Sequence, residues 1–184
     1  EPQILKYKTE QELIDNWANI LYQNNKGIDK LNGQSLTDSE MAQILEQLKT
    51  NPYKLHSFIN GKTIKITRDN PNDPSHLGKD VYLKIYDRNE IAGGQSVYQI
   101  VEQPKFSKHH PLAQERRGDF TLLINGMPVI HVELKKSKEY LSEGINQIIK
   151  YSHENVFTGI FALVQIFVVM TPDETVYFAN PGQS

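Results

Sequence analysis

Three charged residues in the second half of the chain, Asp119, Glu133 and Lys135, have types and a spacing that phosphodiester hydrolysis could use. Two carboxylates, helped by the backbone carbonyl of Leu134, offer hard oxygen ligands to Mg²⁺, and a bound metal ion lowers the pKa of its water. Lys135 follows Glu133 by two residues, so it shares that face of a strand and can orient water or stabilise charge on phosphorus. The same residues also suit a hairpin whose polar face simply meets water, so this pattern leaves both interpretations open.

Two apolar runs, residues 120–124 and 128–134, must position these side chains as the strands of a hairpin. They flank Asn125-Gly126, which is the strongest short-range hairpin signal. A strict two-residue turn would place Asp119 opposite Val132, and the two carboxylates would then point to opposite faces of the sheet.

A three-residue loop, Asn125-Gly126-Met127, instead places Asp119 opposite Glu133, and a bulge that shifts the pairing by one residue would do the same. Hydrophobic patterning favours this register, because it leaves one face wholly apolar and burial of each large side chain is worth roughly 1.5–3 kcal/mol. That face would consist of Phe120, Leu122, Ile124, Ile130, Val132 and Leu134. We therefore predict the three-residue loop. His131 would share the face of the carboxylates, where a partly buried histidine bonded to a neighbour is favoured over a direct role.

A helix after the hairpin could bring further polar groups to the same place. Residues 139–155 have helical periodicity, with the helix starting near Ser142, and Gln147 and Tyr151 lie four residues apart on one face. An amide at position 147 could contact phosphate or hold Lys135. The ring of Tyr151 could equally pack against the sheet.

Composition bounds the class of protein. The chain has 184 residues, 38% of them hydrophobic, and a mean hydropathy of −0.53, which is typical of a soluble globular protein. No run of eighteen apolar residues and no signal peptide occur, so we expect a cytoplasmic protein with no membrane partner. The absence of cysteine excludes disulfides and thiolate metal sites. A net charge of −2 argues against a surface that is basic throughout.

One segment, residues 104–117, is locally basic, with four Lys or Arg residues against one Glu. It is a candidate solvated loop, and alternatively a surface that contacts phosphate. Arg116 and Arg117, together with Lys136 beyond the hairpin, are the candidate DNA-binding residues. His109-His110 in this segment lacks companion ligands at zinc spacing.

The remaining elements complete a mixed α/β sheet with helices packed on it. Helices are expected over residues 9–24, where Thr9 and Glu12 have capping-box spacing, and over residues 37–48. The expected strands are residues 56–59, 63–67, 81–86, 97–102, 161–171 and 176–179, with a turn at Asn60-Gly61. The apolar run 161–171 is typical of a central strand covered on both faces. We expect one domain over 1–184, with helices in 1–50 and the catalytic core in 53–184, cut from a longer chain.

The strings GDFTLLINGMPVIHVELKK and EGINQIIKY together resemble the N-terminal nuclease domain of the R subunit of type I restriction–modification enzymes. That family belongs to the PD-(D/E)XK nuclease superfamily, and the resemblance covers residues 115–180 most strongly. It implies a restriction-endonuclease-like fold in which Asp119 and Glu133 bind Mg²⁺, Lys135 is the catalytic lysine, and Gln147 and Tyr151 form the accessory motif. In the first hundred residues only the pattern agrees, with an early helix that carries an acid such as Glu12. The sequence departs from the superfamily in one place, because Gly118 stands where a proline is nominal.

The resemblance implies a Mg²⁺-dependent endonuclease for double-stranded DNA that assembles with methylase and specificity subunits. It also implies an ATP-driven translocase further along the full-length chain. No Walker A sequence occurs in this segment, so ATP is not expected to be its cofactor. Two alternatives remain open: a non-catalytic nuclease-like docking module, and a free-standing repair or junction nuclease of the same superfamily. Binding of Mg²⁺ or Mn²⁺ that depends on Asp119 would count against the first. Cleavage without ATP or partners would favour the second.

Overall fold

The structure is a computed structural model that describes residues 1–6, 8–49, 57–58, 60–86, 88–106, 116–153 and 157–180. The chain divides into two compact units, and their boundary falls within helix α1 (Glu10–Asn25). Unit 1 comprises Glu1–Leu13 with Tyr98–Ser184, and unit 2 comprises Ile14–Val97. Each unit is described by itself below.

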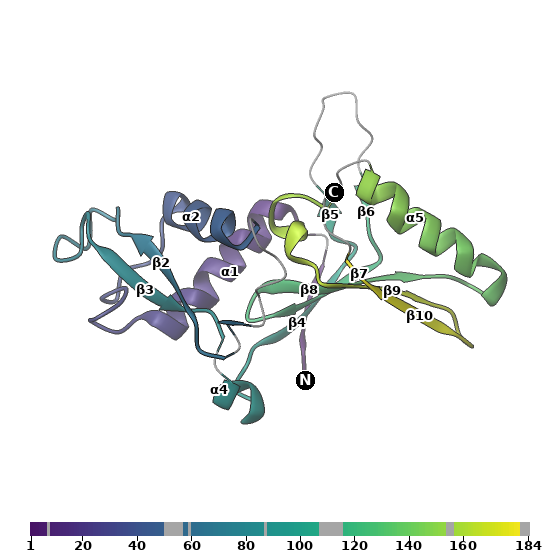
Figure 1. Ribbon diagram of the computed structural model, residues 1–184, viewed down its shortest axis with the longest axis horizontal. Coiled ribbons are helices and arrows are strands. Elements are labelled where there is room, and N and C mark those ends of the chain that lie inside the picture. The colour runs from purple at the N-terminus through teal and green to yellow at the C-terminus, as the bar shows by residue number, and fades with distance from the viewer. Residues whose placement is uncertain are drawn as a thin grey trace. The chain divides into compact units, whose positions relative to one another are not determined.

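Unit 1 is built on a six-stranded mixed sheet, which confirms the predicted fold class (Figure 1). The strand order is β1-β4-β7-β8-β9-β10. The β1–β4 and β8–β9 pairs are parallel and the other three are antiparallel. The strands are β1 (Gln3–Lys6), β4 (Tyr98–Glu102), β7 (Phe120–Ile124), β8 (Met127–Leu134), β9 (Ile166–Met170) and β10 (Thr175–Ala179). The expected strands 97–102 and 176–179 are thus confirmed as β4 and β10, while β1 was not predicted.

The β7–β8 hairpin reaches the predicted register by a different route. Its turn is the two residues Asn125-Gly126, both at positive φ (51° and 82°), and Ile124 pairs with Met127, so the three-residue loop was wrong. A bulge between Leu122 and Leu123 then shifts the pairing by one residue, so that Thr121 faces His131 and Phe120 faces Val132. The next residues outward along the two strands are Asp119 and Glu133.

Pro128 gives a physical reason for the bulge. Proline has no N–H for the ladder and is confined within sheets to edges, strand starts and bulges, yet β8 is paired on both sides. The residue left over between the pairs Leu123–Pro128 and Leu122–Ile130 is Val129. The irregularity therefore lies directly beside the residue that cannot pair normally.

The more deeply buried face of the hairpin is the polar one, whereas the apolar face that was predicted to be buried is only half-covered apart from Val132. Thr121, Leu123, His131 and Glu133 are all at most 1% exposed, whereas Leu134 on the apolar face is 50% exposed. Aromatic rings from distant parts of unit 1 cover the polar face, including Phe106, Phe157 and Phe167, which pack around His131. The prediction considered the hairpin alone, so it could not include side chains supplied by other elements.

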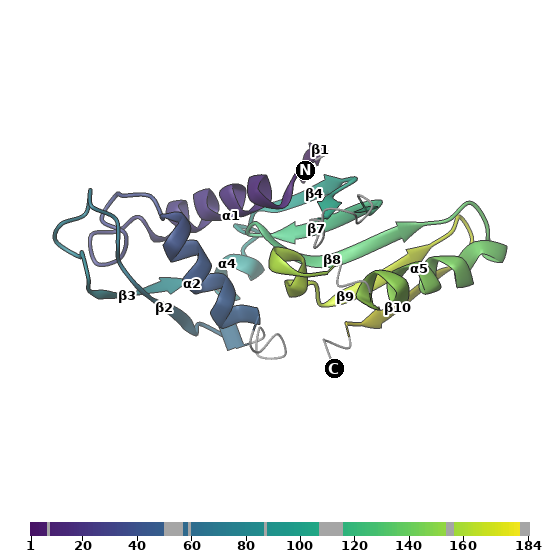
Figure 2. The same cartoon turned by 90° about the horizontal axis from the view of Figure 1, so that it is seen from above.

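Helix α5 (Leu141–His153) lies along one face of this sheet and contacts β8 and β9 (Figures 1 and 2). It matches the predicted helix 139–155, and a 3₁₀ turn, η2 (Lys138–Tyr140), precedes it. Residues 154–156 lie outside the described part of the chain.

The expected central strand 161–171 is wrong in its first part. A 3₁₀ helix, η3 (Gly159–Leu163), occupies that part, and β9 begins only at Ile166. In β9 Phe167 and Val169 are buried, while Met170 is 37% exposed, so the strand is not covered equally on both faces. An apolar run alone does not separate a buried helical turn from a buried strand, and the β-branched residues are concentrated in the later part.

Two short strands, β5 (Lys105–Phe106) and β6 (Arg116–Arg117), form an antiparallel pair in the basic segment. Residues 107–115 between them, which include His109-His110, lie outside the described residues, as do the side chains of Arg116 and Arg117. The prediction that this segment is a surface loop is therefore untested over most of its length.

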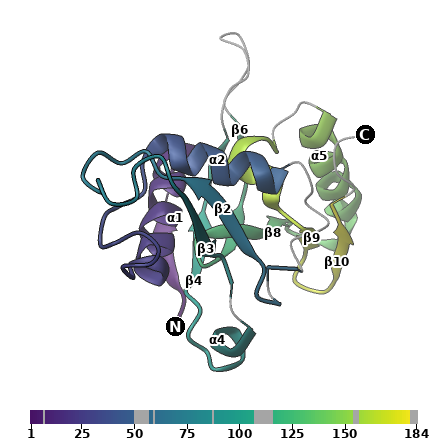
Figure 3. The ribbon, with the colours of Figure 1, turned by 60° about the vertical axis from the view of Figure 1, so that its left-hand side comes forward.

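Unit 2 packs α2 (Asp38–Lys49) against the antiparallel pair β2 (Thr63–Thr67) and β3 (Asp80–Lys84) (Figure 3). These elements match the predicted helix 37–48 and the strands 63–67 and 81–86. Helix α4 (Arg88–Ala92) was not predicted. The expected strand 56–59 was wrong at Ser57 and Phe58, which are helical, while residues 56 and 59 lie outside the described chain; the turn at residues 60–61 is confirmed.

The predicted capping box at the start of α1 is present, and a second one, which was not predicted, begins α2. The Thr9 amide donates to Glu12 Oε2 at 2.8 Å, and the Glu12 amide donates back to Thr9 Oγ1 at 3.3 Å. Thr37 and Glu40 repeat the arrangement at the start of α2. Among the described helices, none has both the length and the apolar character to cross a membrane.

Candidate active site

Asp119 and Glu133 come from the two strands of the hairpin, as the register requires. Asp119 directly precedes β7, and its Oδ2 accepts a hydrogen bond of 2.6 Å from the Leu134 amide. The half-buried carboxylate of Asp119 is therefore tied to the peptide that follows Glu133.

Glu133 is 1% exposed, and both of its carboxylate oxygens accept hydrogen bonds. Oε1 lies 2.8 Å from Nε2 of His131, and Oε2 accepts from Nε2 of Gln147 at 3.1 Å. Burial raises the pKa of Glu133; His131 opposes this through its hydrogen bond and charge, and the nearby charge of Asp119 adds to the rise. A buried carboxylate beside a second carboxylate is an environment in which a bound cation relieves an electrostatic cost.

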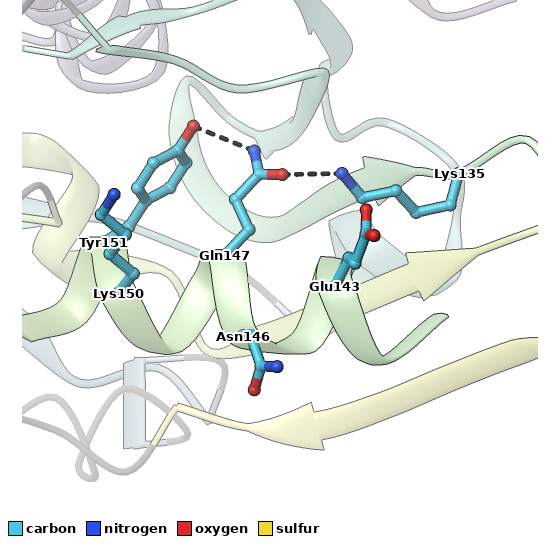
Figure 4. Close-up of a pocket in the computed structure, with 6 residues that line it drawn as sticks. All are labelled: Lys135, Glu143, Asn146, Gln147, Lys150 and Tyr151. Atoms are coloured by element: carbon cyan, nitrogen blue, oxygen red, sulfur yellow. Dashed lines mark hydrogen bonds between the residues drawn. The ribbon is translucent and has the colours of Figure 1, made fainter. Parts of the chain in front are cut away.

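Gln147 connects Glu133 to the lysine, and Figure 4 shows its hydrogen bonds to Lys135 and Tyr151. Its Oε1 accepts a hydrogen bond of 2.7 Å from Nζ of Lys135, while its Nε2 donates to Glu133 and also to Oη of Tyr151 at 2.9 Å. A carboxylate only accepts and an ammonium only donates, so an amide is suited to bridge them, and its orientation is fixed by these partners. Of the two roles considered for Gln147, the contact seen is with the lysine.

Tyr151 both packs its ring and holds a polar group of the site, the two roles considered for it from the sequence. Its ring is buried and packs edge-on against Phe106 and Phe157, with ring centroids 6.0 and 6.1 Å apart. Its hydroxyl accepts the hydrogen bond from Gln147. Packing of the ring thus fixes the position of a polar group that holds the bridging amide.

An open groove runs along α5 beside these residues (Figure 4). The residues that line it all carry polar or charged groups: Lys135, Glu143, Asn146, Gln147, Lys150 and Tyr151. Lys135 and Gln147 reach into this groove from the hydrogen-bonded set, so solvent and a polar ligand have access to the lysine.

Other predicted residues are not brought to this cluster. Glu12 is exposed and hydrogen-bonds Thr9 and Lys8, as its capping role predicts. Lys136 is exposed just beyond β8. Glu10, another acidic residue at the start of α1, accepts a hydrogen bond of 3.0 Å from the Ile160 amide in η3. The sequence did not predict this contact.

The contact between His131 and Glu133 was also not identified from the sequence, although a buried histidine bonded to a neighbour was the favoured interpretation. His131 is fully buried, and its Nδ1 lies 3.0 Å from Oγ1 of Thr121. The alternation of strand side chains places residues 131 and 133 on one face, and this was the signal that could have suggested the pair.

The residues present fit a site for a hard divalent cation. Within the described ranges no three His, Asp or Glu side chains are grouped closely enough to hold a metal ion, so a metal ion at this place would have two carboxylates at most, those of Asp119 and Glu133. Mg²⁺ suits such a sparse site because it keeps several waters and commonly uses one or two carboxylates together with substrate phosphate.

Comparison with known proteins points to one family. The family model described as "Type I restriction enzyme R protein N terminus" matches residues 3–184. The type I restriction enzyme SsaAORF53P endonuclease subunit of Staphylococcus saprophyticus is 33% identical over 177 residues, which cover 94% of this chain and 17% of that protein. The SauMSSORF170P endonuclease subunit of Staphylococcus aureus is 32% identical over 92% of this chain and 17% of its own length.

A third relative, the type I restriction enzyme EcoprrI endonuclease subunit of Escherichia coli, is 33% identical over 105 residues. That match covers 56% of this chain and 32% of the relative. The chain thus spans about a sixth of the length of the staphylococcal relatives that it matches.

Proposed function

Since the chain belongs to the family of type I restriction enzyme R protein N termini, we propose that it is the Mg²⁺-dependent endonuclease domain of such a subunit, acting on double-stranded DNA. The observation that carries this proposal is the linked set Glu133, Gln147 and Lys135, with Asp119 tied to the adjacent peptide. A solvated hairpin face would not need a buried carboxylate and a lysine joined through one amide.

The side chains have distinct parts in this chemistry. Asp119 and Glu133 would hold the metal ion, with the Leu134 carbonyl as a further oxygen. When bound, Mg²⁺ supplies a water of lowered pKa and offsets the charge that develops on phosphorus. Lys135, held by Gln147, places its ammonium at the groove, where it orients the attacking water or contacts the phosphate.

Other parts of the enzyme complex supply the other functions in this proposal. Sequence specificity resides in a specificity subunit, methylation in a methylase subunit, and ATP-driven translocation in the part of the R subunit that this chain does not include. The relatives are named endonuclease subunits of type I enzymes, which supports assembly into such a complex.

Substitution of the three central residues in the assembled enzyme tests the proposal. We expect Asp119→Asn, Glu133→Gln and Lys135→Met each to reduce DNA cleavage by at least about 100-fold, because each removes a charge from the reacting centre. ATP hydrolysis and the thermal unfolding midpoint should be unchanged. Glu139→Gln and Lys138→Met, at exposed positions of η2, are the matched controls and should cleave normally.

Full cleavage by any one of the three variants would overturn the assignment. Titration with Mn²⁺ distinguishes the docking alternative, because a catalytic site should bind the ion and Asp119→Asn should abolish that binding. Cleavage of plasmid by the isolated 184-residue chain without ATP would instead favour a free-standing nuclease.

A further inference from the structure

We propose that His131 is a positioning residue that fixes the carboxylate of Glu133, and that Gly118 lacks a side chain because the His131 ring occupies that space. The inference rests on the proposed nuclease function, since it concerns the orientation of a proposed metal ligand. Neither His131 nor Gly118 is among the residues assigned to the catalytic set above.

The hydrogen bonds of His131 define its role. Its Nε2 lies 2.8 Å from Glu133 Oε1 and its Nδ1 lies 3.0 Å from Thr121 Oγ1. A metal-binding Glu133 must be ionised and can only accept, so Nε2 of His131 donates to it, and the Thr121 hydroxyl, which can donate or accept, bonds Nδ1. Thr121 thereby holds the ring in the orientation that bonds Glu133. The cross-strand pairing of Thr121 with His131 makes this contact a direct product of the bulged register.

Three phenylalanine rings hold the imidazole in place. The centroids of Phe106, Phe157 and Phe167 lie 5.7, 5.3 and 6.4 Å from that of His131, all with steeply inclined planes. His131 is fully buried, and burial of a polar ring is costly unless its nitrogens are hydrogen-bonded. The ring therefore has little freedom to leave Glu133.

Gly118 also borders the imidazole of His131. A Cβ at this position would lie 2.2 Å from Cε1 and 3.0 Å from Nε2 of His131, and 3.1 Å from Cζ of Phe106. Carbon atoms do not approach this closely, so a side chain at residue 118 must displace the imidazole from the atom that bonds Glu133. Proline would in addition lose the hydrogen bond of 3.3 Å that the Gly118 amide donates to the Pro104 carbonyl.

The consequence for Glu133 is a fixed carboxylate plane. His131 holds Oε1 and Gln147 holds Oε2, so the carboxylate cannot rotate about its last bond without losing one of them. Groups that support a metal ligand in this way typically contribute about 10–100-fold to metal affinity or activity.

The test uses the full-length R subunit assembled with its partners, in which we compare His131→Leu, His131→Gln and the exposed control His153→Leu. We expect His131→Leu to lower the turnover number by about 10–100-fold with little change in KM for DNA. It should weaken Mn²⁺ binding, measured by calorimetry without ATP, to a similar extent. His131→Gln, whose amide can still donate to Glu133, should recover most of both losses, and His153→Leu should behave as wild type.

Gly118→Ala tests the steric half of the proposal. Alone it should reproduce the losses of His131→Leu, whereas in a His131→Ala background it should add less than about twofold, because the ring it would displace is gone. Additive losses in that double variant would overturn the coupling. Equal losses in His131→Gln and His131→Leu that follow a lowered unfolding midpoint of the metal-free protein would show a purely structural histidine and overturn the positioning role.

Failure of this inference is distinguishable from failure of the proposed function. If Asp119→Asn and Lys135→Met abolish cleavage while His131→Leu retains normal turnover and Mn²⁺ affinity, His131 has no positioning role and the nuclease assignment stands. If Asp119→Asn cleaves normally, the nuclease assignment fails and this inference fails with it.

Discussion

At the scale of single residues, the site depends on an amide placed between two charges of opposite sign. Gln147 accepts from Lys135 and donates to Glu133, which neither a carboxylate nor an ammonium at this position could do for both partners. Helical spacing and strand alternation were sufficient to predict that Gln147 lies near Lys135. They could not predict the contact between Gln147 and Glu133, because Glu133 is buried by aromatic residues that lie far away in the sequence.

Replacement of the amide should therefore impair catalysis without unfolding the protein. We expect Gln147→Ala to lower the turnover number of the assembled enzyme by about 10–100-fold, since both Lys135 and Glu133 lose a partner that fixes them. Asn146→Ala is the matched control, because Asn146, the residue before Gln147 in α5, lines the same groove but points away from Lys135 (Figure 4). Equal activities of the two variants, in a cleavage assay at saturating DNA, would contradict the role given to Gln147.

At the scale of elements, the close approach of α5 to the sheet sets the distance between Gln147 and Lys135. Gly144 faces the sheet, and a Cβ there would lie 2.5 Å from Cγ1 of Val169 and 3.2 Å from Cε of Lys135. Glycine in a helix normally costs about 1 kcal/mol relative to alanine, so its presence here has a packing reason. It provides the space in which the stem of the lysine passes beneath the helix.

Gly144→Ala should consequently destabilise the protein, although the same change would stabilise an isolated helix. Propensity alone favours alanine by about 1 kcal/mol, but the helix must move away from Val169 to accommodate the methyl group, which typically costs about 1–3 kcal/mol. We expect a lower unfolding midpoint and weaker cleavage, because Gln147 moves with the helix. Ser142→Ala, at an exposed position of α5, is the control, and a raised midpoint with full cleavage in Gly144→Ala would contradict the packing role.

The hairpin shows why element boundaries were harder to predict than element types. Asn125-Gly126 correctly indicated a tight turn, and the demand that Asp119 face Glu133 correctly indicated a shift of one residue. The position of that shift was wrong, because the ladder requirement of Pro128 was not weighed against the loop. The apolar patterning also identified the register correctly, but it did not predict that the polar face would be the more deeply buried one, since coverage by Phe157 and Phe167 is a tertiary effect.

At the scale of the whole molecule, all the residues proposed for catalysis belong to unit 1, whereas unit 2 is held by a polar cluster of its own. Arg68 is 1% exposed; its guanidinium donates to Glu40 at 2.6 Å and to Asp73 at 3.2 Å. It also donates to the backbone carbonyls of Leu31, Gln34 and Ser35. A buried charge with this many partners is costly to disturb, because removal of one partner leaves the others uncompensated.

The charge state of Asp73 links this cluster to pH. Burial raises the pKa of Asp73, but hydrogen bonds from Asn32, Ser75, His76 and Arg68 together outweigh burial and hold the pKa well below its ordinary value of 3.8. A carboxyl with a lowered pKa in the folded state stabilises the protein above its unfolded pKa, and this contribution is lost as the pH falls towards the folded value. Acid should therefore weaken unit 2 below about pH 3.8.

Trp17, the only tryptophan in the chain, is 1% exposed within unit 2, so its fluorescence follows the unfolding of that unit. We expect Asp73→Asn to lower the free energy of unfolding at pH 7 by about 3 kcal/mol in urea titrations, because Arg68 loses a charged partner. This penalty should shrink steadily below pH 3.8, because protonation of Asp73 in the unfolded chain then removes part of the advantage that its ionised carboxylate gives the folded state. Asp80→Asn, which removes the exposed ion pair with Lys65, should cost less than about 1 kcal/mol. A penalty for Asp73→Asn that is the same at pH 7 and pH 3 would mean that the charge of Asp73 does not stabilise unit 2.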